Sequence, residues 1–149
     1  MMKIYVATSW KNWRHKQIVK ALIDKGYHVY DFKANGGFHW SHVDPLYKTT
    51  EYSAKEFNNI LNHPLAVRGY NRDMDALNES DICVLVLPCG RSSHLELGYA
   101  IGARKYSIIY FPPGEPPDLM YGMVDKIVGT LPELIKAVKD YEGRHIRKG

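Results

Sequence analysis

The residue best suited to chemistry in this sequence is Glu96, because of the segment that surrounds it, from Asp81 to Lys105. An unbroken apolar run leads there through a turn with proline and glycine into a predicted helix over Ser93 to Lys105, with Glu96 in its first turn. Ligands bind α/β proteins where a buried strand leads into a helix N-terminus in this way. A carboxylate at this point is a candidate nucleophile or general base above the carboxyl edge of a sheet.

Glu96 also has a purely structural interpretation. The spacing Ser93-x-x-Glu96 fits a capping box, in which each side chain binds a backbone N–H group at the start of its own helix. Taken alone, that spacing favours the cap. The two interpretations predict different partners, because a capping glutamate folds back onto its own helix whereas a catalytic one points into a cleft.

Two aspartates, Asp73 and Asp75, are candidates for a second catalytic group. They flank Met74 on a predicted helix that ends where the strand beginning at Asp81 starts, and Asp73 lies about two turns back. This spacing predicts that Asp73 comes within reach of Glu96. Two carboxylates that flank a pocket are what glycosidic cleavage requires, since one attacks the anomeric carbon and the other assists the leaving group. The alternative for either aspartate is a solvated helix face.

The residues just before Glu96 could hold a phosphate. Free backbone N–H groups, two hydroxyls and a guanidinium converge at the predicted helix N-terminus, from Gly90, Arg91, Ser92 and Ser93. The sequence lacks the motifs of other nucleotide-binding and hydrolase sites. There is no G-x-G-x-x-G or P-loop lysine, and neither serine lies in a G-x-S-x-G elbow.

We expect neither a metal nor another cofactor. The segment with His39, His42 and Asp44 has histidines and a carboxylate, but it lacks the helical context and the cysteine partners of a metal site.

The length and the net charge of the chain limit the number of domains and the kinds of partner that we expect. A chain of 149 residues predicts one domain, over residues 1–141. The net charge of +4 includes a basic segment over residues 142–149, which we expect to be a flexible tail. The remaining charge is too small to predict binding to a nucleic-acid polymer.

Two cysteines do not make a disulfide framework, and the apolar runs are too short to span a membrane, so we expect a cytoplasmic protein.

Strands alternate with helices along the whole chain. This alternation predicts a doubly wound, flavodoxin-like α/β sandwich with a mostly parallel sheet of four or five strands. The predicted strands are 3–7, 27–32, 81–87, 106–111 and a short fifth at 127–129; the predicted helices are 11–25, 51–61, 64–80, 93–105 and 131–141. Helical spacing puts Leu95, Tyr99 and Ala103 inward on one helix, and Val67, Tyr70, Met74 and Leu77 inward on another.

The segment from Lys33 to Thr50 has no clear periodicity and is long for a connection in a compact domain. Its aromatics include Phe38 and Trp40. Two interpretations stay open: a lid or binding loop that uses these rings, and a loop held down by its own aromatic side chains.

Four places in the chain resemble the nucleoside 2-deoxyribosyltransferase family. The resemblance runs in fragments over most of the chain. The places are Lys3-Ile4-Tyr5 with Trp10, the aspartate Asp73 eight residues before Asp81, the E-x-G-x-A motif from Glu96 to Ala100, and Asp118-Leu119-Met120.

The resemblance implies a doubly wound sheet and a covalent 2-deoxyribosyl-enzyme intermediate. Glu96 would attack C1′ of a nucleoside, and Asp73 would assist the departure and return of the base. It implies no metal or redox cofactor, and a homodimer or larger oligomer whose neighbouring subunits complete the site. The expected substrate-binding residues are Tyr5, Ser9, Trp10, Asp75, Gly90, Arg91, Ser92, Ser93 and Met120.

The chain departs from the family pattern in two segments. Arg91-Ser92-Ser93-His94 replaces a Gly-Thr or Gly-rich pair. Arg91 and the two serines would suit a 5′-phosphate, as in the related nucleotide N-hydrolases. Val124-Asp125-Lys126 stands where transferases use an asparagine, so base transfer and hydrolysis both stay open. Two other functions also stay open: a TIR-like NAD glycohydrolase, which shares this topology and a catalytic glutamate, and a non-enzymatic nucleotide-binding module.

Overall fold

The computed structural model describes residues 1–146, apart from the side chains of Asn35 and Ile146. The described chain divides into two compact units, one of Met1–Asp31 together with the chain from Leu77 onward, and one of Phe32–Ala76. The elements are β1 (Lys3–Ala7), α1 (Arg14–Asp24), β2 (His28–Tyr30), α2 (Ala54–Leu61), α3 (Pro64–Glu79), β3 (Ile82–Val86), α4 (Arg91–Gly102), β4 (Tyr106–Tyr110), β5 (Lys126–Val128) and α5 (Leu131–Ile146).

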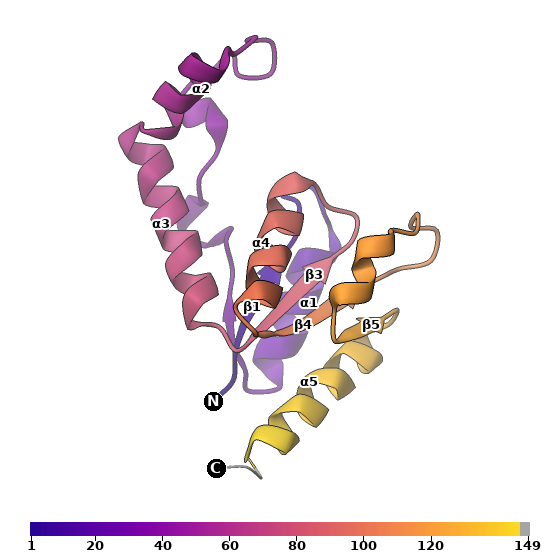
Figure 1. The fold of residues 1–149 in the computed structure, drawn as a ribbon. Helices are drawn as coiled ribbons and strands as arrows, with labels where there is room; N and C mark the ends of the chain where they lie inside the picture. The colour runs from indigo at the N-terminus through magenta and orange to yellow at the C-terminus, as the bar shows by residue number, and fades with distance from the viewer. Residues whose placement is uncertain (147–149) are drawn as a thin grey trace. The chain divides into compact units, whose positions relative to one another are not determined.

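The first unit is built on one sheet. Within the described residues it has five strands, all parallel, in the order β2-β1-β3-β4-β5 (Figure 1). The predicted flavodoxin-like fold is therefore confirmed, and the short fifth strand is present as an edge. Ile4 of β1 pairs with Ile82 of β3, and Ile82 pairs with Tyr106 of β4.

Both faces of the sheet are covered, because successive side chains along a strand point to opposite faces. Figure 1 shows α4 in front of the sheet and α1 behind it. One set of alternate side chains, which includes Ile4, Val84 and Ile108, forms a core cluster with buried residues of α1 and α5. The other set includes Tyr5 and Cys83, and lies on the face that α4 covers.

Helix α4 differs from its prediction in both its start and its buried face. It begins at Arg91, and its buried residues are Ser93, Leu97 and Ala100. The predicted inward residues Leu95 and Tyr99 are 75% and 44% exposed, so that prediction is wrong. The stripe that faces the sheet contains a serine and an alanine, and such small side chains let a helix pack closely on a sheet.

Helices α3 and α5 also differ in part from their predictions. In α3, Leu77 is fully buried as predicted, but Val67 and Tyr70 are 40% and 66% exposed. Helix α5 continues past Tyr141 to Ile146, so residues 142–146 of the predicted tail are helical. Residues 147–149 of that tail lie outside the described residues.

The second unit gathers the aromatic side chains of the irregular segment. The Phe38 ring lies edge-on to Trp40 with centroids 5.0 Å apart, and Trp40 packs against Phe57 of α2 at 5.9 Å. Phe38 also lies against Gly69 of α3, where an added Cβ would come within 2.8 Å of it. These contacts agree with a segment held down by its own aromatics, whereas the lid role of Phe38 and Trp40 stays a prediction.

None of the helices in the described part of the chain is both long enough and apolar enough to cross a bilayer.

A buried asparagine joins the ends of the two central strands. The Asn12 amide nitrogen lies 3.1 Å from Thr8 Oγ1, 3.3 Å from the Val86 carbonyl and 3.2 Å from the Pro88 carbonyl. Its Oδ1 accepts a hydrogen bond from the Arg14 amide at the start of α1. One side chain thus holds together the turn after β1 and the turn after β3.

We predict that Asn12→Ala lowers the free energy of unfolding by about 2 kcal/mol or more, because it removes a buried side chain that binds the Val86 and Pro88 carbonyls and accepts a hydrogen bond from the Arg14 amide. Urea denaturation would measure the change. Asn71→Ala, at an exposed position of α3, is the matched control and is expected to stay within about 0.5 kcal/mol. An Asn12 variant as stable as this control would contradict the role assigned to Asn12.

Candidate active site

The strand order creates one switch point, between β1 and β3. The chain leaves β1 towards β2 on one side and leaves β3 towards β4 on the other, so the two connections diverge. Ligands of open α/β sheets bind in the crevice at the carboxyl ends of such strands. A cavity of about 270 Å³ lies there, lined by Ser9, Lys11 and Asn12 after β1 and by Pro88 and Cys89 after β3.

Glu96 does not cap its own helix. Because α4 begins at Arg91 with Gly90 as its N-cap, Glu96 lies in the second turn, and the predicted capping box with Ser93 is wrong. The half-buried Glu96 carboxylate instead accepts a hydrogen bond from the hydroxyl of Tyr5, 91 residues away in the sequence. The structure thus shows a partner outside the helix for Glu96, and not the backbone amides of its own helix.

Tyr5 is a rigid donor for this hydrogen bond. Its side chain is 1% exposed on the central strand β1, and its ring stacks on Tyr30 of β2 with centroids 5.3 Å apart and planes 18° apart. A tyrosine with its ring held in this way has little freedom to move its hydroxyl. The Glu96 carboxylate is therefore oriented by the sheet and by its own helix together.

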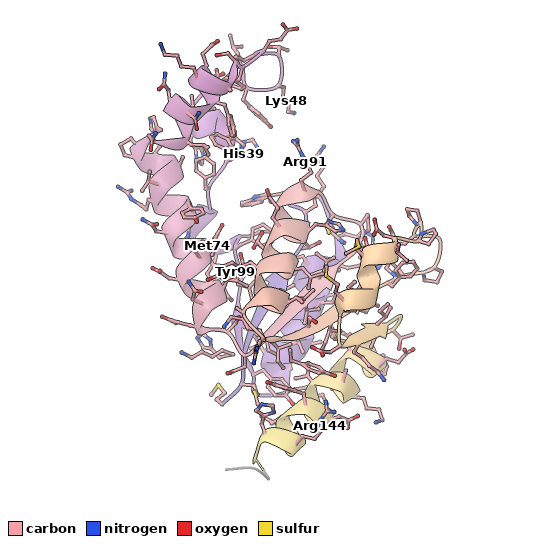
Figure 2. The ribbon with its side chains drawn as sticks, viewed as in Figure 1. His39, Lys48, Met74, Arg91, Tyr99 and Arg144 are labelled. Carbon is pink, nitrogen blue, oxygen red and sulfur yellow. The ribbon has the colours of Figure 1, made fainter. Side chains whose placement is uncertain are left out.

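The N-terminus of α4 is not capped by a side chain. Gly90 offers no side-chain acceptor to the first amide groups of the helix. Arg91 and Ser92 are exposed on the first turn, and the Arg91 side chain extends outward from it (Figure 2). Ser93 is 3% exposed and is hydrogen-bonded to the Cys89 thiol, so it lies beneath Arg91 and Ser92. Free amides beside an exposed guanidinium can hold an anion.

His94 links this helix to the segment after β4, and sequence reasoning did not single it out. Its Nδ1 lies 2.8 Å from the Gly90 carbonyl and its Nε2 lies 2.8 Å from the Tyr121 hydroxyl. The two rings stack with planes 18° apart. One feature of the sequence indicated that His94 has this partner: Tyr121 follows Met120, which was already a predicted site residue.

Cys89 and His94 do not form a nucleophilic pair, although Cys89 Sγ lies 3.7 Å from His94 Nδ1. A carbonyl oxygen can only accept, so the short contact with Gly90 means that Nδ1 carries a hydrogen and cannot take the thiol proton. Burial is the main cause that raises the pKa of the Cys89 thiol to about 11; a hydrogen bond with Ser93 opposes it, and the nearby Glu115 and Glu96 carboxylates add to it. The thiol is thus protonated at neutral pH.

Met120 lies in a different cavity, of about 210 Å³, which it lines with His94, Gly98 and Tyr121 among others. Glu96 is two positions from both His94 and Gly98, which places it roughly on the opposite side of α4. Within one chain, the structure therefore brings Met120 to His94 and not to Glu96.

The remaining predicted site residues fall in two groups. Ser9 lines the crevice, and Trp10, next to it, is 43% exposed. Asp73 and Asp75 belong to the second unit with Phe38 and Trp40, where Asp73 is half-buried and Asp75 is exposed. Their place in the site stays a prediction.

The candidate metal residues are occupied otherwise. Asp44 accepts hydrogen bonds from Thr50 and Tyr52 and from the Leu46 amide, which hold its pKa below the usual value. Among residues 1–146, no three His, Cys, Asp or Glu side chains come together as a metal site would need.

Comparisons with known proteins agree on the fold. No protein-family model matches the chain, and no curated protein matches its sequence. Among solved structures, a 2-deoxyribosyltransferase from Bacillus psychrosaccharolyticus is similar at 19% identity and a TM-score of 0.62, with 89% of each chain covered. The CMP N-glycosidase BcmB of Clostridium botulinum is similar at 18% identity and a TM-score of 0.52, over 92% of this chain and 98% of that one.

A conserved protein from Enterococcus faecalis V583 is also similar, at 15% identity and a TM-score of 0.63, over 95% of this chain and 99% of that one. The structural similarity to a 2-deoxyribosyltransferase and to an N-glycosidase is thus clear. At these identities it shows a shared fold.

We predict that Cys89 reacts slowly with a thiol reagent at neutral pH and faster as the pH approaches about 11, because only the thiolate is nucleophilic. The initial rate of iodoacetamide labelling at Cys89, followed by peptide mass spectrometry from pH 7 upward, would measure this. Fast labelling with a plateau below pH 8 would show an activated thiol and contradict the assignment.

Proposed function

We propose that this protein breaks the N-glycosidic bond of a nucleoside or nucleoside 5′-monophosphate through a covalent glycosyl-glutamate intermediate on Glu96. The sugar passes to water in hydrolysis or to a second base in transfer. The fold shared with a 2-deoxyribosyltransferase and with a CMP N-glycosidase supports this class of substrate.

One observation carries the proposal: the Glu96 carboxylate turns away from its own helix terminus and is held by Tyr5 from the central strand. Its helix begins at the switch point, beside the crevice where ligands of such sheets bind. A helix-capping role would have left the carboxylate among its own backbone amides. An oriented, half-buried carboxylate is what a nucleophile at an anomeric carbon requires.

The reaction needs two carboxyl groups in complementary roles. A Glu96 oxygen attacks C1′, the bond from C1′ to the base nitrogen breaks, and the base leaves with the electron pair while Asp73 supplies a proton. Water or a second base then attacks C1′, the ester bond to Glu96 breaks, and Asp73 takes back the proton. In this scheme Asp75, Trp10 and Ser9 bind the substrate without taking part in bond breaking.

The first turn of α4 favours a substrate with a 5′-phosphate. Arg91 and Ser92 are exposed there, beside amide groups that no side chain caps. A phosphate would receive hydrogen bonds from these amides and a paired contact from the guanidinium. A free nucleoside would leave them to water.

We infer a homo-oligomer in which the segment from Leu119 to Met123 reaches the site of a neighbouring copy. Met120 lies on the side of α4 away from Glu96, so it cannot serve that carboxylate within one chain. Leu119 and Met120 are 91% and 58% exposed, which is unusual for large apolar side chains unless another surface covers them.

We predict that Glu96→Ala lowers the rate of base release by about 1,000-fold or more, because it removes the atom that attacks C1′. The assay is chromatography of the free base after incubation with a panel of nucleosides, 5′-monophosphates and NAD. The isosteric Glu96→Gln should be as inactive, while Glu51→Gln, at an exposed position, should retain full activity.

The intermediate itself can be measured by the intact mass of acid-quenched wild-type protein, which should show one added sugar with a nucleoside, or one added sugar phosphate with a 5′-monophosphate. A variant without Glu96 that still released base would rule out the nucleophile, and NAD as the sole substrate would favour a glycohydrolase of the TIR type.

We predict that Asp73→Asn lowers the rate of base release by about 100-fold or more, since general acid–base groups contribute on this scale. Asp75→Asn should cost clearly less. Steady-state kinetics of both variants on the best substrate of the panel would compare them. Equal losses would remove the reason for assigning the proton transfer to Asp73.

A further inference from the structure

A second cavity lies at the other edge of the sheet, against α5. Its volume is about 530 Å³, within the range of small-molecule sites. Tyr106 and Lys126, the first residues of β4 and β5, form one wall, and α5 forms the other. Because parallel strands share one direction, this groove lies at the amino ends of the strands, whereas the Glu96 crevice lies at their carboxyl ends.

A stack of flat side chains joins the two walls of the groove. The Tyr106 ring packs on Tyr141 of α5 with centroids 4.3 Å apart and planes 17° apart. The guanidinium of Arg144 lies over the Tyr106 ring, 5.6 Å from its centroid (Arg144 is labelled in Figure 2). This stack holds Arg144 at the groove instead of leaving it free in solvent.

The groove has an excess of positive charge that its own carboxylates do not balance. Lys126, Lys139 and Arg144 line it together with Asp125 and Asp140. Asp140 is paired with Lys136 at 2.7 Å, outside the groove lining.

Asp125 is likewise engaged, and by the sheet. Its Oδ2 accepts hydrogen bonds from the Ser107 amide at 2.9 Å and the Ser107 hydroxyl at 3.1 Å. The hydrogen bonds from Ser107 leave the charge of Asp125 in place, and the pKa of Asp140 is lowered by Lys136 and also by Arg144 and Lys126. The lining therefore keeps a small excess of positive charge, with three cations against two carboxylates.

Gly143 leaves part of the groove lining without a side chain. It lies within α5, and a Cβ at this position would meet no atom within 4 Å. A large side chain introduced here can therefore enter the groove without first meeting other protein atoms.

We propose that this groove binds a phosphate-bearing small molecule, held by Lys126, Lys139 and Arg144. Guanidinium and ammonium groups around a cavity of this size match a compact polyanion such as pyrophosphate or the phosphate chain of a nucleotide. The site is separate from Glu96 and does not rest on the proposed glycosidic activity.

Isothermal titration calorimetry of the full-length protein at constant ionic strength tests the proposal, with inorganic pyrophosphate and ATP as separate probes. At least one probe should bind, and Arg144→Gln and Lys139→Gln should each weaken that binding by about tenfold. Gly143→Phe should block it by filling the groove. Lys139 is exposed on α5, so its variant keeps the test valid if Arg144→Gln fails to fold.

Lys16→Gln is the matched control, because it removes one exposed cation from α1 instead. It should leave the binding of both probes unchanged. Binding by neither probe, an equal loss in Lys16→Gln, or full binding in the Lys139 and Gly143 variants would overturn the proposal. Tighter binding of a short single-stranded oligonucleotide than of either probe would overturn it in favour of a nucleic-acid surface. Binding of ATP but not pyrophosphate would support it and identify the nucleotide as the ligand class.

Discussion

The parallel pairing of β1 with β3 at the centre of the sheet is the constraint on which the rest of this structure depends. Parallel strands cannot be joined by tight turns, so each connection crosses a face of the sheet and both faces become buried. At β1 and β3 the crossings diverge, and the two turns that follow these strands form the walls of a crevice. Asn12 holds those turns together through carbonyl groups of the β3 end. The order of the strands therefore creates the crevice of the candidate site, whatever side chains line it.

The fold was predictable from the sequence because its signals are local. Apolar runs such as Ile82 to Leu87 mark buried strands, and Gly26 marks the end of the first helix, so the order of elements follows from residues close together in the chain. The buried face of α4 was not predictable in the same way. Helical spacing allows two inward stripes, one with Leu95 and Tyr99 and one with Ser93, Leu97 and Ala100. Only contact with the sheet decides which stripe is buried.

The surroundings of Glu96 were predictable in part. Tyr5 and Glu96 were both singled out in the sequence, but the hydrogen bond between them and the residue at which the helix starts were not. The Ser93-x-x-Glu96 spacing resembles a cap, yet Gly90 precedes it in a conformation that starts the helix earlier without any side-chain bond. The partners of Glu96, Asn12 and His94 lie 91, 76 and 27 residues away along the chain. Hydrogen bonds of this range depend on the packed sheet and leave no periodic pattern in the sequence.

The arrangement at the start of α4 is hard to explain by stability alone. A side chain that accepts hydrogen bonds at the N-cap would stabilise this helix, and Gly90 has none. Here the carboxylate is held half-buried by Tyr5 from the sheet, and no side chain caps the amides. Burying part of a charged group costs free energy, and leaving the helix uncapped forgoes a stabilising contact. Local rules are broken in this way mostly at functional sites, and under the proposed function the carboxylate would serve the sugar and the uncapped helix terminus its phosphate.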